Sequence, residues 1–200
     1  MANSGSKNPV KILRGGYEDF SAMYPFLRTQ KILYMPQEYD SIQTFPCEVL
    51  PGIMYIGSSK QAHDKFIHKE LKIRAHINLS HEKDMFFSES NTDTYLHVPI
   101  DDTDDADFTS YIDKIVSFID TNRNELRTIL VWSSNGISRS AAACILYLMS
   151  YYKWPMRDAW RHMRSCKFMI RPNRGLVKQL AKFEEKHLGK QITDIEDPNY

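Results

Sequence analysis

The stretch Ile129–Ser140 constrains the fold of this chain more than any other. Its first three residues are apolar and indicate the end of a buried strand, and the apolar run Ala141–Met149 that follows predicts a buried helix. Between them, Asn135 and Gly136 allow a tight turn. A strand, a loop of small residues and a helix N-terminus direct backbone N–H groups and the positive end of a helix dipole at one point. We therefore predict an anion site there, to which Arg139 adds a planar fork for two phosphate oxygens.

This loop resembles the signature loop of cysteine-dependent protein phosphatases, above all that of the dual-specificity group. The family pattern is His-Cys, two residues, Gly, two residues, Arg, and then Ser or Thr. The matching positions are Gly136, Ser138, Arg139 and Ser140. Two positions depart from the pattern, because Trp132 stands in place of the His and Ser133 in place of the nucleophilic Cys.

The resemblance implies that the loop holds phosphate. The implied phosphate-binding residues, which we call the anion cradle, are Ser133, Ser134, Asn135, Gly136, Ile137, Ser138 and Arg139. Ser140 and Asn173 are implied as supports of the loop, since the family has a similar Pro-Asn turn and Pro172-Asn173 matches it.

The two departures fall on the chemistry of the family. Its members attack phosphorus with a thiolate, whose pKa of about 8.5 is lowered by the helix N-terminus and by nearby cations. A serine hydroxyl is far less acidic and needs a positioned base, and the indole of Trp132 can only donate a hydrogen bond. We therefore interpret the chain as a pseudophosphatase of the inactive branch of the family, in which Ser133, Trp132 and Asp102 are degenerate positions.

Other interpretations of the loop have to be weighed. A strand-turn-helix corner could carry an arginine without any ligand, but the Gly, the Ser-Arg-Ser run and the flanking apolar residues agree with one another. A serine hydrolase would need a second Gly where the run Gly136–Ser140 ends in Ser. A single substrate-trapping change is disfavoured because two positions differ. The alternative that stays open is a weakly active protein phosphatase with Ser133 as its nucleophile.

An acidic segment, residues 101–107, carries five aspartates between a predicted strand and a predicted helix. By its distance from Val98-Pro99-Ile100, Asp102 holds the position at which the family has its general acid. Mutual repulsion is expected to raise the pKa values of the cluster, and the other aspartates are expected to be solvated acids that cap a helix. We also expect the segment to lie close to the cradle, where it would oppose Arg139 and weaken phosphate binding.

The rest of the chain predicts a single α/β domain. From Phe45 onward strands alternate with helices, which implies a central sheet with helices on both faces, here of the cysteine-phosphatase-like, dual-specificity type. With 200 residues, 42% of them hydrophobic, the chain can bury one proper core. We predict a truncated rhodanese-like remnant and linker at 1–44, the phosphatase-like domain at 45–190, and a mobile acidic tail at 191–200. The first part resembles the end of the rhodanese-like domain of MAP-kinase phosphatases, so the chain is expected to be a short form or a fragment.

Local patterns place the elements of that domain. Strands are expected at 48–50, 54–56, 75–80 and 94–100, and a helix at 108–122. A helix that begins near residue 58 is expected to turn Ala62, Phe66 and Ile67 inward. Lys167, on a polar face of a later helix, is expected to be solvated.

Composition and spacing argue against several classes of function. The net charge of +1 gives no basis for binding nucleic acid or a membrane surface. The spacing of His76, His81 and His97 suits no metal site, and we expect neither a metal nor a cofactor. Three scattered cysteines suit a reducing compartment, hence the cytoplasm, with nuclear or mitochondrial association left open. We expect a monomer. The resemblance implies that its partners are phosphorylated proteins or signalling proteins (phosphatases, kinases or scaffolds) in stress and MAP-kinase signalling.

Overall fold

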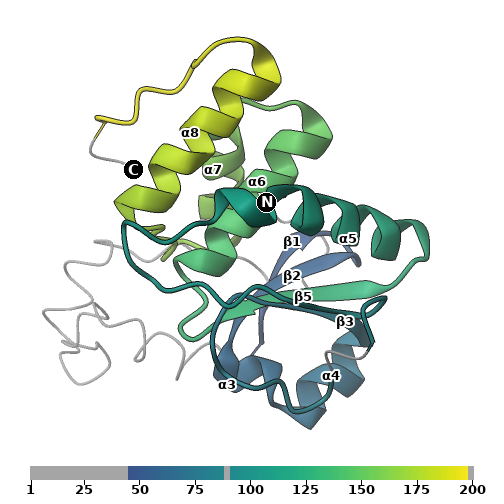
Figure 1. The fold of residues 1–200 in the computed structure, drawn as a ribbon. Coiled ribbons are helices and arrows are strands. Elements are labelled where there is room, and N and C mark those ends of the chain that lie inside the picture. The colour runs from purple at the N-terminus through teal and green to yellow at the C-terminus, as the bar shows by residue number, and fades with distance from the viewer. Residues whose placement is uncertain (1–44, 88–90, 198–200) are drawn as a thin grey trace, which may run out of the picture. The chain divides into compact units, whose positions relative to one another are not determined.

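The computed structural model describes residues 45–87 and 91–197, so the predicted remnant and linker at 1–44 lie outside the described residues. Figure 1 shows the strands and helices in this part of the chain. They are β1 (Cys47–Leu50), β2 (Met54–Ser58), α3 (Ser59–Ala62), α4 (Lys65–Leu71), β3 (Ile73–Asn78), β4 (Tyr95–His97), the 3-10 helix η2 (Thr109–Tyr111), α5 (Ile112–Asn124), β5 (Thr128–Ser133), α6 (Arg139–Tyr152), α7 (Met156–Cys166) and α8 (Arg174–Leu188). Within the described residues, no helix combines the length and the apolar character that crossing a bilayer requires.

The five strands form one mixed sheet in the order β1-β2-β5-β3-β4. β1 and β2 are antiparallel and meet at the predicted turn, where Gly52 has φ +68°. β2, β5, β3 and β4 run parallel. β5 is therefore the central strand, and the loop that follows it leaves the carboxyl edge of the sheet at its middle. Ligands of open α/β sheets bind at this kind of edge.

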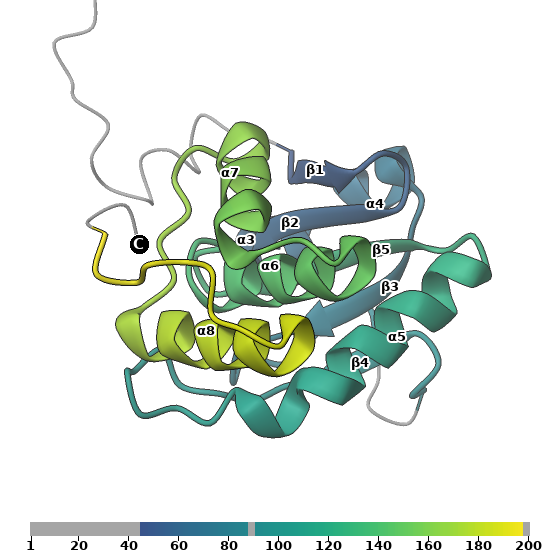
Figure 2. The same cartoon turned by 90° about the horizontal axis from the view of Figure 1, so that it is seen from above.

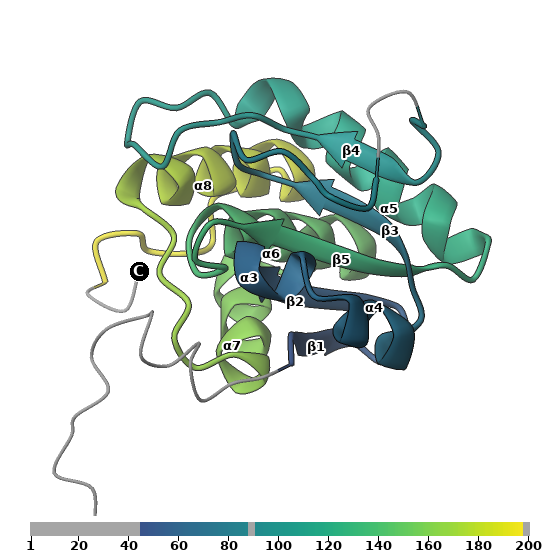
Figure 3. The ribbon, with the colours of Figure 1, turned by 90° about the horizontal axis from the view of Figure 1, so that it is seen from below.

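Helices cover both faces of the sheet, as the sequence predicts. α5, α6, α7 and α8 lie on one face (Figure 2), and α3 and α4 lie on the other (Figure 3). The first face holds the large core, in which α6 is buried from Arg139 to Met149. The second face holds a smaller core, which we call the second core. It consists of Ala62, Ile67, Ile73, Leu130 and Trp132. The predicted α/β class, a central sheet with helices on both faces, is confirmed.

Two predicted side-chain positions are wrong. Phe66 is 56% exposed, although Ala62 and Ile67 are buried as expected. The chain forms two short helices here, and Asp64 starts the second one by accepting a bond from the backbone of Phe66, which changes the register of the inward face. Lys167 is buried rather than solvated, with 1% of its surface exposed. It follows the last residue of α7 in extended backbone, with φ −136°, so the face of the helix does not determine where its side chain points.

Part of the tail that is predicted to be mobile is bonded to the domain at Ile192 and Thr193. Glu184 on α8 is fully buried and accepts hydrogen bonds from Ile192 N at 2.8 Å, from Thr193 N at 2.8 Å and from Thr193 Oγ1 at 2.7 Å. The same carboxylate accepts a bond from Met156 N at 2.7 Å, at the start of α7. A single buried acid thus anchors the tail to two helices.

Candidate anion-binding site

The cradle is a turn between the end of the central strand and the start of the most buried helix. Ser133 is the last residue of β5 and Arg139 is the first residue of α6. Gly136 lies between them with φ +70°, and a Cβ at this position would be 2.5 Å from the carbonyl oxygen of Gly57. Only glycine meets both demands, the positive φ and the close approach of a neighbouring backbone. The signature glycine therefore fixes the path of the loop.

The carbonyl groups of the loop are turned toward the surrounding protein. Ser134 O accepts a bond from the amide of Ser59 at 3.3 Å, and Ile137 O accepts one from Arg171 N at 2.7 Å. The amides of residues 134–138, in contrast, have no hydrogen-bond acceptor in the part of the chain that the structure describes. Unpaired backbone donors at the start of a 14-residue helix are the arrangement that binds anions.

Arg139 is held firmly by its own protein. Only 7% of the residue is exposed, and its NH1 donates to the carbonyl oxygen of Ile100 at 2.8 Å. Its NH2 donates to the hydroxyl of Ser134 at 3.2 Å. The guanidinium is thus fixed against the loop, and the carbonyl of Ile100 is a partner that sequence analysis missed, since backbone acceptors leave no mark in the residue types.

Ser133 is buried, and its hydroxyl lies 3.0 Å from that of Ser140. Either oxygen can donate in this pair. No histidine or carboxylate within residues 45–87 and 91–197 bonds the Ser133 hydroxyl. A hydroxyl whose neighbour is a second hydroxyl has no group of suitable pKa to take its proton. The structure thus brings Ser133 and Ser140 together, but without the base that a serine nucleophile needs.

Trp132 does not face the cradle. It is fully buried in the second core, where its ring meets the ring of His63 edge-on at a centroid distance of 5.2 Å and that of His76 at 6.3 Å. Its indole nitrogen has no hydrogen-bond partner among the described residues. Trp132 therefore contributes packing below the loop, and no polar group to the loop itself.

Asp102 reaches the cradle from the acidic segment. One carboxylate oxygen accepts a bond from the hydroxyl of Ser138 at 2.5 Å and another from the side-chain amide of Asn173 at 2.9 Å. The other oxygen lies 3.7 Å from Nε of Arg139. The structure thus places a carboxylate beside the one buried cation of the described cradle, which is the opposition that the sequence leads us to expect.

Asn173 connects three parts of the site. Its backbone N–H donates to the hydroxyl of Ser138 at 3.3 Å, and its side-chain nitrogen donates to Asp102. Its side-chain oxygen caps α8 by accepting from Leu176 N at 2.9 Å. Gly175, two residues further on, has no room for a side chain, because a Cβ would lie 1.8 Å from the carbonyl oxygen of Asp104. Close packing of α8 against the acidic segment therefore sets the position of Asp102.

The other aspartates have ordinary local roles. Asp107 accepts bonds from the hydroxyl of Ser110 and from its amide, the latter at 3.2 Å, at the start of η2, and these bonds lower the pKa of Asp107. The prediction that mutual repulsion raises the pKa values of the cluster is therefore wrong for Asp107. Asp104 accepts from Gly175 N at 3.1 Å, and Asp101 pairs with His81 at 3.0 Å. The described residues contain no cluster of side chains suited to a metal ion.

Comparison with known proteins assigns the fold and the loop to one family. The family model described as "Dual specificity phosphatase, catalytic domain" matches residues 54–186, which include the whole cradle and Asp102. The chain belongs to the dual specificity phosphatase family. The chain is similar to Dual specificity protein phosphatase 5 of Rattus norvegicus, with 31% identity over 206 residues, covering 90% of this chain and 51% of the relative. The chain thus spans about half the length of the curated relatives it matches.

Solved structures of the same family superpose on this dual specificity phosphatase domain. Human DUSP28 has a TM-score of 0.64 and 26% identity, covering 70% of this chain and 93% of that one. The human tyrosine phosphatase-like serine/threonine/tyrosine-interacting protein has a TM-score of 0.63 and 27% identity, covering 72% of this chain and 99% of that one. The likeness therefore extends over nearly the whole of each of these domains.

Proposed function

We propose that this chain is a catalytically inactive, phosphatase-like regulator that binds phosphoproteins or signalling complexes through the anion cradle or the surface beside it. It modulates stress and MAP-kinase signalling without removing phosphate. The observation that carries this proposal is the environment of Ser133, whose buried hydroxyl bonds the hydroxyl of Ser140 and, among residues 45–87 and 91–197, no base. Binding and chemistry are thereby separated, because the donors of the loop are present while the nucleophile is not activated.

Several features support a place in the inactive branch, nearest to the serine/threonine/tyrosine-interacting-like pseudophosphatases. The chain has a Ser at the nucleophile position and an aromatic residue, Trp132, before it. It shares with them the Pro-Asn-Arg-Gly-Leu-Val run at 172–177 and an acidic tail that ends in Tyr200. We also propose that it acts as a monomer in the cytoplasm, on signalling partners such as phosphatases, kinases or scaffolds.

Hydrolysis of a generic aryl phosphate tests the loss of activity. We compare the wild type with Ser133→Cys and with the double variant Trp132→His plus Ser133→Cys. We expect no turnover from the wild type, little from the single variant, and clear activity from the double variant, because a thiol then stands at the end of β5 and both family residues are restored. Wild-type turnover that Ser133→Ala abolishes would instead establish a weak serine-dependent phosphatase.

Partner capture tests the use of the cradle. We compare the proteins retained by the wild type with those retained by Arg139→Met, which removes the fork but keeps a long apolar side chain in the same place. Partners that depend on a phosphate group are expected to be lost, and partners that use another surface to be kept. Because Arg139 also bonds Ile100 and Ser134, thermal unfolding of the variant is measured beside the capture. If a folded Arg139→Met variant retains all partners, the cradle does not bind them and that part of the proposal is wrong.

A further inference from the structure

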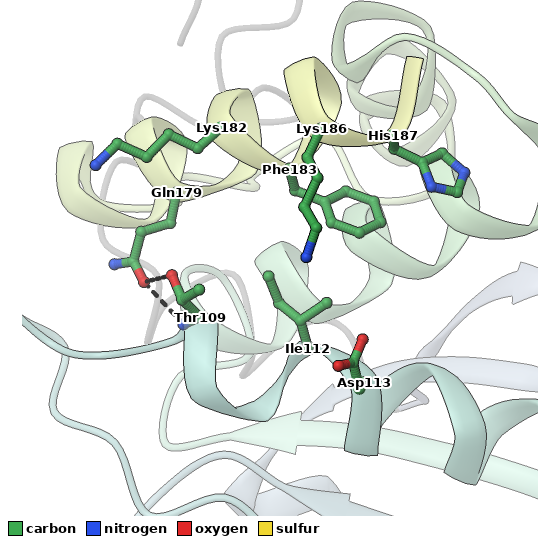
Figure 4. Close-up of a pocket in the computed structure, with 8 residues that line it drawn as sticks. All are labelled: Thr109, Ile112, Asp113, Gln179, Lys182, Phe183, Lys186 and His187. Atoms are coloured by element: carbon green, nitrogen blue, oxygen red, sulfur yellow. Dashed lines mark hydrogen bonds between the residues drawn. The ribbon is translucent and has the colours of Figure 1, made fainter. Parts of the chain in front are cut away.

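A pocket that is lined by none of the cradle residues lies between α8 on one side and η2 with the start of α5 on the other (Figure 4). Its volume is about 330 Å³, which is at the lower end of the size of small-ligand sites. Ile112 and Phe183 provide its apolar surface, and Lys182 and Lys186 stand on the α8 side. The pocket therefore combines an apolar floor with cationic side chains at its rim.

The end wall of the pocket is rigid. The side-chain oxygen of Gln179 accepts bonds from Phe108 N and Thr109 N at 2.9 Å each and from the Thr109 hydroxyl at 2.8 Å. Its nitrogen donates to the carbonyl oxygens of Ala106 at 2.8 Å and Gly175 at 3.3 Å. With five bonds, Gln179 has no capacity left for a ligand. It joins α8 to η2, so the pocket is formed before anything enters it.

The charges around the pocket are not balanced. Lys182 and Lys186 are one helical turn apart on α8, and within the described residues neither has an ion-pair partner. Like charges at this spacing destabilise a helix slightly. Partial burial lowers the pKa of His187, and so does the ammonium of Lys153, whose Nζ lies 2.9 Å from Nε2 of His187. The one carboxylate that lines the pocket is that of Asp113. An anion beside α8 would relieve this excess of positive charge.

We propose that the pocket binds a peptide segment of a protein partner in which one apolar side chain is flanked by carboxylates. The apolar side chain would bury against Ile112 and Phe183, and the carboxylates would pair with Lys182 and Lys186. An open pocket with solvated lysines at its rim suits a peptide, because a peptide supplies two or more charges around one apolar anchor. The ligand of this site carries carboxylates beside an apolar side chain. Its binding does not require phosphate in the cradle.

Nuclear magnetic resonance of the isotope-labelled chain tests the proposal with synthetic peptides. The probe is the acetylated and amidated peptide EEFEE, and the controls are EEAEE, without the anchor, and KKFKK, with the charge reversed. We expect EEFEE to shift the Ile112 methyl signal in a saturable way and to bind at least five-fold more tightly than either control. Equal binding of EEFEE and EEAEE, or no saturable shift at millimolar peptide, would overturn the proposal.

Substitutions on one face of α8 locate the charges. Lys182→Gln and Lys186→Gln are each expected to weaken EEFEE binding about two- to five-fold, in line with the worth of an exposed ion pair. The matched control is Lys178→Gln, an exposed lysine on the same helix that does not line the pocket, and it should change binding less than 1.5-fold. If all three variants bind equally, the lysines do not recognise the ligand and the proposal is wrong.

Two further measurements distinguish the proposed peptide from a small organic anion and this pocket from the cradle. Phenylacetate titrated alone reports a small organic anion, and binding as tight as that of EEFEE would replace the peptide by a metabolite-like ligand. Inorganic phosphate added to the peptide complex reports the cradle through the amide of Gly136. We expect phosphate to leave the Ile112 shift unchanged. Displacement of the peptide by phosphate would place it in the cradle and overturn the proposal, whereas failure of phosphate to bind would count against the cradle alone.

Discussion

The two faces of the sheet hold two different kinds of core. On the face covered by α5–α8, side chains such as Leu146 and Ile145 pack in a large apolar cluster, and one buried acid, Glu184, is surrounded by donors. On the face covered by α3 and α4, the cluster around Trp132 is small and lined by the rings of His63, His68 and His76. The cradle leaves the strand that both cores share.

The difference between the two cores determines what a substitution at the start of the loop affects. Trp132 faces the small core, so replacing the family's His by an indole adds apolar surface to a cluster that has few other large side chains. Ser133, the next residue of the strand, points to the opposite face, where its hydroxyl bonds Ser140 on α6. One departure from the family pattern therefore lies in the packing of the second core, and the other lies in the cradle.

Truncation of Trp132 in the second core is expected to have the largest effect on stability. Trp132→Ala is expected to lower the free energy of unfolding by about 3–5 kcal/mol, because it removes the largest fully buried side chain of the described residues and leaves a cavity. Leu146→Ala in the large core is the matched change, with an expected loss of about 2–5 kcal/mol. Urea unfolding followed by far-ultraviolet circular dichroism measures both. A loss below about 1 kcal/mol for Trp132→Ala would mean that the second core can collapse around the gap.

Removal of the buried acid Glu184, on the side of the large core, is expected to cause the next largest loss of stability. Glu184→Ala leaves Met156 N, Ile192 N, Thr193 N and the Thr193 hydroxyl without their acceptor. With about 1–3 kcal/mol for each buried donor that stays unpaired, and partial access of water to the released tail, we expect a loss of about 3 kcal/mol. Hydrogen exchange at Ile192 and Thr193 should rise at the same time. The exposed neighbour Glu185→Ala is the control, and a similar loss there would contradict this account.

Acidification should affect mainly the second core. Burial lowers the pKa values of His76 and His68, although Asp84, at 2.5 Å from His76, opposes the shift for His76. Because the unfolded imidazole has a pKa of about 6.5, the unfolded chain takes up protons first as the pH falls. The stability that these groups contribute is thus complete above about pH 6.5 and is lost as the pH decreases below it.

The expected loss between pH 7 and pH 5 is about 1–2 kcal/mol, since one group contributes at most about 1.4 kcal/mol per pH unit. Burial opposes the shift, but hydrogen bonds lower the pKa values of Asp84, which bonds His76, and of Glu184, which accepts from Thr193. These carboxylates therefore lose their contribution only at more acidic pH. Urea midpoints at the two pH values measure the loss, which His68→Phe should reduce and the exposed His81→Gln should not. An equal loss in all three proteins would assign it to groups outside the second core.

The sequence was sufficient for the elements that make the cradle but not for what packs around it. The apolar periodicity of α6 and the strand before it are local signals, and they are strong because both elements are buried along most of their length. Asp102 could be placed near the cradle by its position in the family pattern, yet its bonds to Ser138 and Asn173 depend on how α8 packs. Glu184 and Lys167 were missed because charged residues in sequence predict solvent, and only tertiary contacts decide otherwise.

Removal of one charge at the cradle is the smallest of the expected effects and the most direct test of anion capture. Asp102→Asn keeps the size of the side chain and an oxygen that can accept from Ser138, but it removes the negative charge 3.7 Å from Arg139. We expect phosphate or vanadate affinity, measured by the shift of the Gly136 amide, to increase about three- to ten-fold, since the anion no longer shares the guanidinium with a carboxylate. Asp105→Asn, an exposed change in the same segment, should increase it less than two-fold through long-range charge alone. Equal gains in the two variants would show that the overall charge of the segment limits binding, and unchanged affinity in Asp102→Asn would show that its carboxylate and the anion do not compete for Arg139.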